Sequence, residues 1–115
     1  MTDRPLLVVI NPNTDSTVTA FMAKIVAATV GNAIRVDGRT AASGPPLITN
    51  EETLTRAVDE VLHAGQIAAT DGAAAILVSA FGDPGVAALR HCISIPVTGI
   101  AEASMAEAAK GGRRF

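Results

Sequence analysis

Short apolar runs alternate with longer amphipathic segments along the chain. Leu6 to Ile10 is a continuous apolar run rich in β-branched residues, which predicts a strand buried on both faces. Three further runs follow, and between them apolar residues recur at helical spacing. The predicted strands cover residues 6–10, 33–37, 74–79 and 95–98. The predicted helices cover residues 16–29, 51–70, 84–91 and 101–110.

This alternation predicts a single α/β domain over residues 1–115. A strand that is followed by a helix and another strand forms a parallel pair with a right-handed crossover. We therefore expect a doubly wound, four-stranded parallel sheet of the flavodoxin-like order 2-1-3-4, with helices on both faces. In such sheets, ligands bind beyond the carboxyl ends of the strands, where the strand order reverses.

Capping residues indicate where the predicted helices begin. Thr14 or Asp15 is placed to cap the first helix, and a Gly-Asn pair follows its last turn. Asn50 is the expected N-cap of the second helix, whose first turn is acidic. Asp83 is expected to cap the third helix, with Pro84 in its first position, where proline loses no hydrogen bond.

Polar and small residues gather in the loops at the predicted ligand-binding edge. The loops 11–14 and 79–83 flank the point where the strand order reverses, and the turn-rich loop 38–49 is long enough to be functional. Their amides, hydroxyls and glycines suit a small polar ligand with carboxylate or carbonyl oxygens. The candidates are Asn11, Asn13, Thr14, Ser43, Ser79 and Gly82. The alternative is structural: these side chains satisfy turn backbone, and Asp83 only caps a helix.

The composition narrows the classes of function. The chain is 49% hydrophobic, carries a net charge of -2, and has three Phe but no Trp or Tyr. A weakly acidic chain without aromatic platforms is poorly suited to nucleic acids or anionic membranes, so we expect neither as a partner. No apolar run approaches the roughly 20 residues that span a bilayer. His63 and His91 lack metal-ligand spacing, so we expect no metal site.

The cysteine content indicates the compartment. Cys92 is the sole cysteine, which excludes an internal disulfide and leads us to expect a cytoplasmic protein. The first apolar run is too short for a secretory signal. Because Cys92 follows the third predicted helix, away from the strand ends, we expect a small buried thiol with no catalytic role.

Three segments resemble the Asp/Glu/hydantoin racemase superfamily, most closely its hydantoin and allantoin racemase branch. They are Ile10-Asn11-Pro12-Asn13-Thr14, Phe81-Gly82-Asp83-Pro84-Gly85 running on to Leu89-Arg90, and Ile95-Pro96-Val97-Thr98-Gly99-Ile100-Ala101-Glu102-Ala103. Gly44-Pro45, before the acidic start of the second long helix, also agrees. Order and spacing hold across nearly the whole chain, which therefore resembles the N-terminal half of a two-domain racemase.

The resemblance implies a cofactor-independent isomerase built from two similar α/β halves, with the active site between them. In this family one cysteine from each half flanks the substrate carbon; a thiolate removes the α-proton, and the opposite thiol delivers a proton to the other face. The implied substrate is a cyclic ureide or an amino-acid derivative. The implied substrate-binding residues are Asn11, Asn13, Thr14, Ser43, Gly44, Ser79, Phe81, Gly82 and Asp83.

The chain departs from the family pattern at the position that matters most for catalysis. Ala80 stands where the family has its first-half cysteine, and a methyl group cannot exchange a proton. Cys92 lies twelve positions later and does not align with it. The second cysteine belongs to a half that this chain lacks. We therefore expect a racemase by ancestry that is inactive as this chain.

Two other interpretations stay open. The chain is either a non-catalytic module that still binds a small carboxylate or ureide, or an assembly module. For the latter, the residues after the fourth helix resemble the start of a fifth strand that is not completed, which leaves the fourth strand as a sheet edge. Such an edge pairs readily with another chain, so we expect a homo-oligomer.

Overall fold

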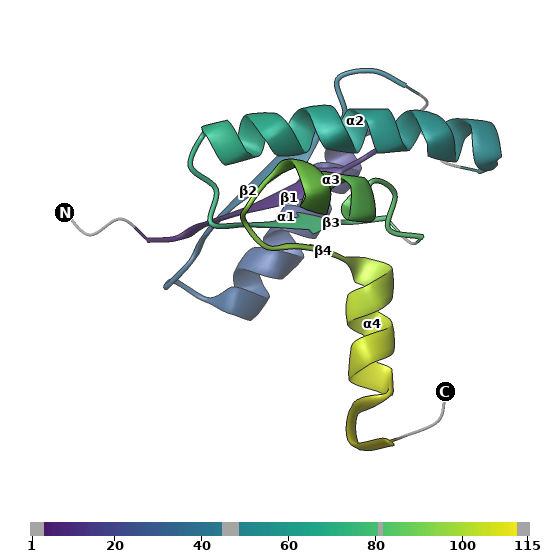
Figure 1. The fold of residues 1–115 in the computed structure, drawn as a ribbon. Helices are drawn as coiled ribbons and strands as arrows, with labels where there is room; N and C mark the ends of the chain where they lie inside the picture. The colour runs from purple at the N-terminus through teal and green to yellow at the C-terminus, as the bar shows by residue number, and fades with distance from the viewer. Residues whose placement is uncertain (1–3, 45–48, 81, 113–115) are drawn as a thin grey trace.

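The computed structural model of the chain describes residues 4–44, 49–80 and 82–112. Its centre is a four-stranded sheet of order β2-β1-β3-β4 in which each neighbouring pair is parallel, and this confirms the predicted fold (Figure 1). The strands are β1 (Leu6–Asn11), β2 (Arg35–Thr40), β3 (Ala75–Val78) and β4 (Val97–Gly99). The helices are α1 (Ser16–Val30), α2 (Glu51–Thr70), α3 (Val86–Cys92) and α4 (Ile100–Ala108), followed by the short 3-10 helix η1 (Lys110–Gly112).

The two faces of the sheet are covered unequally. Figure 1 shows α2 and α3 on one face and α1 on the other. The main core lies on the α2 and α3 side, where Ile10, Ile76, Val78 and Leu89 are almost fully buried. On the α1 side, Val9 is fully buried, but Leu77, its partner in the parallel register with β3, is only half-buried. The helix α1 therefore covers β1 and β2 and leaves part of β3 open.

The predicted helix starts are confirmed for the two long helices. The Asp15 carboxylate caps α1 by accepting hydrogen bonds from the backbone N–H groups of Thr17 and Val18. Asn50 caps α2 in a reciprocal arrangement with Thr53, in which each side chain bonds the other's backbone N–H. These caps satisfy N–H groups that have no partner inside the helix.

The second strand lies further along the chain than predicted. It runs from Arg35 to Thr40 and pairs with β1 along its whole length, whereas the sequence predicts a strand over residues 33–37. The prediction ended the strand at residue 37 because Gly38 is typical of a turn, but Gly38 lies inside the strand. A Cβ at Gly38 would lie 2.9 Å from Thr19 Cγ2 and 3.0 Å from Ala23 Cβ, so glycine lets α1 approach the sheet closely.

The start of α3 also differs from the prediction. The N-cap is Gly85, in a left-handed conformation with φ of 78°, and no side chain caps this helix. A Cβ at Gly85 would lie 2.9 Å from the side chain of Val61, so the turn is packed tightly against α2. The expected Asp83 cap and Pro84 first position of α3 are therefore wrong, because both residues precede the helix in the turn.

The expectation of a buried thiol is also wrong, because Cys92 is exposed at the end of α3.

The outer edge of β4 is partly occupied by a side chain. The guanidinium of Arg90 donates hydrogen bonds to the carbonyl oxygen of Val97 at 2.9 Å and 2.7 Å. The preceding carbonyl, of Pro96, accepts from Ile76 N on the β3 side, so Val97 O points the opposite way, toward the open edge. A second strand could pair here only by displacing Arg90, and pairing of two chains through β4 stays a prediction.

We predict that Gly65→Ala destabilises the protein, although alanine is normally the better helix former. A Cβ at Gly65 would lie 2.4 Å from Leu89 Cδ2, where α2 packs on α3. Overpacking of this kind should lower the free energy of unfolding by about 1 to 3 kcal/mol, measured by urea denaturation. In a Leu89→Ala background the same substitution should be nearly neutral, and an equal loss in both backgrounds would contradict the explanation.

Candidate functional site

The carboxyl ends of the strands bring three loops to one edge of the sheet. Ile10 pairs with Val78 in the parallel register, and Ser79 N donates to the Ile10 carbonyl oxygen at 2.9 Å. From the loop after β2, Ala41 N donates to the carbonyl oxygens of Asn11 and Asn13 at 3.0 Å and 3.2 Å. The turns after β1, β2 and β3 are thus bonded together where the strand order reverses.

The buried side chain of Asn11 stabilises this edge through hydrogen bonds. Its side chain is 1% exposed, and its Nδ2 lies within 3.0 Å of three acceptors: Asn13 Oδ1, the Asp15 carbonyl and Thr19 Oγ1. Asn11 Oδ1 accepts from Asn13 N at 3.2 Å. With its amide engaged in this way, Asn11 holds the β1–α1 turn in shape, and its predicted contact with a ligand gains no support.

Thr19 completes this network, and the sequence analysis did not single it out. Its Oγ1 accepts from Asn11 and lies 2.7 Å from Thr40 Oγ1 at the end of β2, so the chain of hydrogen bonds joins β1, α1 and β2. Thr19 is 5% exposed. A threonine in the buried stripe of a helix, eight residues after an asparagine at a strand end, is the one signal that could have identified it.

Asn13 and Thr14 are the polar residues of this turn that remain available to a ligand. Asn13 Oδ1 accepts from Asn11 Nδ2 and from Asp15 N, each at 2.9 Å. Among the described residues, neither Asn13 Nδ2 nor the hydroxyl of Thr14 has a hydrogen-bond partner, and both side chains are half-buried. The turn therefore presents an amide donor and a hydroxyl at the edge of the sheet.

The turn after β3 faces the same edge. The hydroxyl of Ser79 donates to the Ile10 carbonyl at 3.0 Å and is buried, so it joins two strands. Ala80 is half-buried at the first position of the turn, and its carbonyl accepts from Asp83 N at 3.1 Å. Gly82 is exposed with φ of 93°, a conformation that favours glycine. Phe81, also expected at this site, lies outside the described residues.

The loop after β2 contributes less than expected. The exposed hydroxyl of Ser43 donates to a carboxylate oxygen of Glu60 on α2. Gly44 follows with φ of 109°. The described contacts of Ser43 tie this loop to α2, and they do not bring its hydroxyl to the turns of β1 and β3.

Asp83 caps a helix, but the helix is α4 and not α3. Its two carboxylate oxygens accept hydrogen bonds from Ala101 N and Glu102 N, each at 2.8 Å. The residue adopts a left-handed conformation with φ of 50° to reach this position. Gly99 makes the contact possible, because a Cβ there would lie 2.1 Å from Asp83 Oδ1. The anion-binding end of α4 is therefore already filled by a carboxylate of the same chain.

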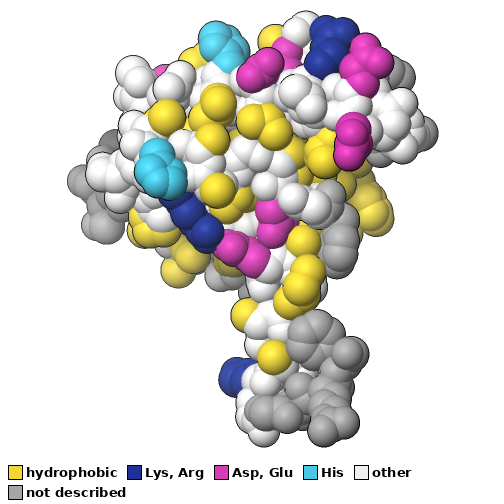
Figure 2. Space-filling view, turned by 45° about the vertical axis from the view of Figure 1, so that its right-hand side comes forward, with side chains coloured by type: hydrophobic (Ala, Val, Ile, Leu, Met, Phe, Trp, Pro, Cys, Tyr) yellow, Lys and Arg dark blue, Asp and Glu magenta, His cyan; other side chains and the backbone are white. Residues whose placement is uncertain are grey.

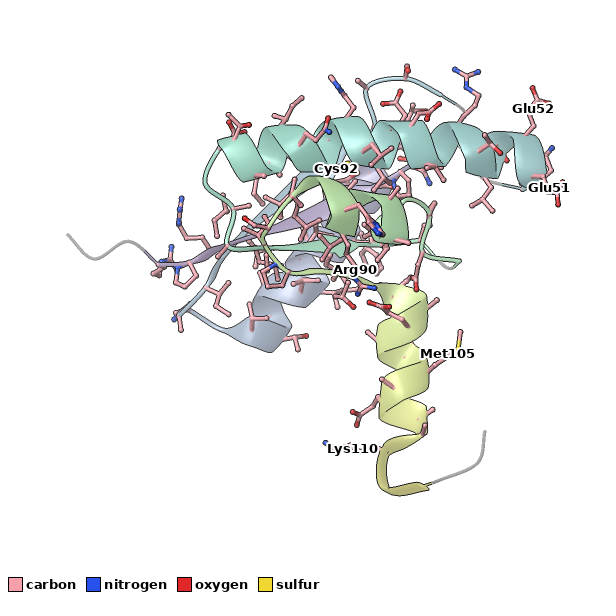
Figure 3. All side chains as sticks on the ribbon, in the orientation of Figure 1. Glu51, Glu52, Arg90, Cys92, Met105 and Lys110 are labelled. Carbon is pink, nitrogen blue, oxygen red and sulfur yellow. The ribbon has the colours of Figure 1, made fainter. Side chains whose placement is uncertain are left out.

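A second set of polar contacts holds the first turn of α4. Arg90, which is labelled in Figure 3, forms an ion pair with Glu102. Thr98 Oγ1 donates to Glu102 Oε1 at 2.8 Å. The hydrogen bonds from Arg90 and then from Thr98 hold the pKa of the Glu102 carboxyl below its ordinary value of 4.5. Together with Asp83, these residues join the end of α3, β4 and α4.

The surface also has a hollow away from this edge. It measures about 760 Å³ and borders β2 near Arg4, Arg35, Arg39 and Asp71. Its charged groups mostly bond one another or nearby backbone, as in the pair of Arg39 Nη1 with Asp71 at 2.7 Å. Because those groups are engaged, this hollow is a weaker candidate for a ligand site than the strand ends.

Residues 4–44, 49–80 and 82–112 lack two further features. They contain no group of three or more His, Cys, Asp or Glu side chains arranged to hold a metal ion. None of their helices combines the length and the apolar character that crossing a membrane requires.

Comparisons with known proteins agree with the fold and its order of elements. The sequence model described as Asp/Glu/Hydantoin racemase matches residues 7–115. An allantoin racemase from Klebsiella pneumoniae is 30% identical with a TM-score of 0.88, over 91% of this chain and 43% of that one. An allantoin racemase from Pseudomonas fluorescens shares the fold at 22% identity and a TM-score of 0.84, over 90% of this chain and 43% of that one. The chain thus spans less than half the length of either. No curated protein sequence gives a significant match.

We predict that Asp83→Ala lowers the free energy of unfolding by about 1 to 2 kcal/mol, since α4 loses its cap and alanine is strained at positive φ. Asp83→Asn is the matched variant, because asparagine keeps an acceptor oxygen and tolerates the left-handed conformation. It should cost clearly less, as measured by urea denaturation. An unchanged free energy of unfolding in Asp83→Ala would show that the carboxylate contacts with Ala101 and Glu102 contribute little.

Proposed function

The chain belongs to the Asp/Glu/hydantoin racemase family, and we propose that it forms one wall of a racemase-type cleft that binds a small ureide or carboxylate without turning it over. One observation carries this proposal. The turns after β1 and β3 leave the same edge of the sheet, with Asn13 Nδ2 and the Thr14 hydroxyl unoccupied by described residues and Ala80 at the base of the facing turn. The same proposal includes a cytoplasmic, cofactor-independent protein, supported by its family and its single cysteine.

The ligand class follows from the groups at this edge and from the relatives. Allantoin, the compound after which both similar racemases are named, is a cyclic ureide rich in carbonyl oxygens and N–H groups. The Asn13 amide can donate to a carbonyl oxygen, and the Thr14 hydroxyl can donate or accept. Asp83 already accepts the hydrogen bonds of the first N–H groups of α4, so these groups are not available to a ligand carboxylate. A neutral ureide therefore fits the edge better than a dicarboxylate does.

Racemisation needs a base on one face of the reacting carbon and an acid on the other. At the position of the family's first-half cysteine this chain has Ala80, which supplies neither. Cys92 cannot replace it, because α3 runs back from the strand ends and carries this thiol toward the opposite end of the sheet. We therefore propose that the chain contributes binding groups and no proton-transfer group.

We predict that allantoin and hydantoin raise the thermal unfolding midpoint of the chain, because a ligand that binds only the folded state stabilises it. At about tenfold the Kd, the stabilisation should reach about 1.4 kcal/mol. Thr14→Val, which keeps the side-chain shape, should reduce the ligand-induced shift, whereas Asn32→Ala, at the other end of α1, should leave it unchanged. If neither compound shifts the midpoint at millimolar concentration, the binding proposal fails.

We also predict that Ala80→Cys promotes slow exchange of the α-proton of allantoin with solvent deuterium, without racemisation. A thiolate at this position is a base on one face only, so the proton returns to the face that it left. NMR measures the exchange, polarimetry measures racemisation, and both are compared with the rate without protein. Ala80→Ser is the matched control, because its hydroxyl is too weak a base to exchange the proton. Full racemisation by Ala80→Cys alone would contradict the two-base mechanism.

A further inference from the structure

The open part of the α1 face forms an apolar groove. It measures about 180 Å³ and lies between α1, β3 and the start of α4. Its lining residues are Met22, Ile25, Val26, Leu77, Ser79 and Ile100. The only polar side chain among them, Ser79, donates its hydroxyl to Ile10 O, so the groove offers packing and no charged or hydrogen-bonding recognition. Ile25 is 51% exposed at its border, which an uncovered apolar face explains.

The helix α4 is also largely exposed in the part of the chain that the structure describes. It projects from the body of the molecule on the side of the sheet that carries α1, and its main contact among the described residues is with β4 (Figures 1 and 2). Of its nine residues only Ala101 is buried, and Met105 is 48% exposed. Isolated helices shorter than about 12 residues are marginal in water, so α4 needs a surface to pack on.

We propose that two copies of the chain form a symmetric dimer in which the α4 helix of each copy packs in the apolar groove of the other. Among the described residues, the chain carries both a largely exposed helix and an apolar groove, and we take these as the two halves of a reciprocal contact. Ile100 is both the first residue of α4 and part of the groove lining, so the helix leaves the body at the border of the groove. A two-fold axis near Ile100 then places both helices at once.

Two features favour this contact over pairing through the edge of β4. Arg90 occupies the outward carbonyl of Val97, so edge pairing must first break two hydrogen bonds. The anchoring of the first turn of α4 by Asp83 and by Glu102 fixes the direction in which the helix projects. A rigidly aimed helix loses little conformational freedom when a second copy receives it.

The test is sedimentation velocity and light scattering of the 115-residue chain from about 1 μM to about 500 μM, with three single variants. Met105→Glu places a charge on the projecting helix, and Ile25→Glu places one at the border of the groove. Ile67→Glu is the matched control, because Ile67 is similarly exposed, at 45%, but lies on α2 on the other face of the sheet. Far-UV circular dichroism verifies that each variant is folded.

We expect the unmodified chain and Ile67→Glu to dimerise, and Met105→Glu and Ile25→Glu each to weaken the dimer about tenfold or more. A chain that is monomeric across the whole range would overturn the proposal, as would a dimer that neither substitution weakens, since it would then pair elsewhere. A dimer weakened by Ile25→Glu but not by Met105→Glu would show that the two grooves face each other, and would overturn the exchange of α4.

Discussion

The buried amide of Asn11 is the interaction on which the architecture of the candidate site depends. A polar side chain that is withdrawn from water needs hydrogen-bond partners, and the Asn11 amide has three of them, at Asn13, Asp15 and Thr19. It joins the end of the first strand to the start of α1 and, through Thr19 and Thr40, to the end of β2. Among the buried side chains no described polar atom is left without a partner, so the network is complete. The shape of the turn that presents Asn13 and Thr14 is a consequence of this network.

A second polar contact links the site to the rest of the molecule. Asp83 lies in the turn after β3, yet its carboxylate binds the first N–H groups of α4, eighteen and nineteen residues later. The turn that carries Ala80 and the direction of α4 are therefore coupled through one side chain. Gly99 is needed for this contact, because any larger residue would occupy the space of the Asp83 carboxylate. Changes at either end of this contact should affect both the site edge and the helix.

The fold was predictable from the sequence because it depends on local and repeated signals. The alternation of apolar runs and helical periods predicts a parallel sheet covered by helices, and Asp15 and Asn50 mark helix starts through contacts within three residues. The errors have a different origin. Gly38 is typical of a turn, but its role is to let α1 pack closely on β2. Asp83 precedes α3, but it caps α4. Both roles are set by residues distant in the sequence, which periodicity and capping rules do not include.

The candidate site was predictable to the same extent. Because the strands are parallel, the loops after β1 and β3 must leave the same edge of the sheet. The strand order does not predict that Asn11 is buried while Asn13 stays available to a ligand. Neighbouring asparagines look alike in a sequence, and only the packing of α1 decides which one is buried. The uncovered α1 face was also missed, because whether a helix such as α4 returns to the sheet depends on tertiary packing that no local pattern records.

Charged side chains stand at both borders of the sheet. On β2, the first strand in spatial order, Arg35, Asp37 and Arg39 alternate with smaller residues, and Asp37 pairs with Arg39. On β4, at the opposite border, Arg90 occupies a backbone acceptor. Ribbons that end in this way resist the addition of further strands, which is the route by which open sheets grow into fibrils. A symmetric contact through helices or sheet faces closes after a fixed number of copies, so association of that kind should yield small particles and not fibres.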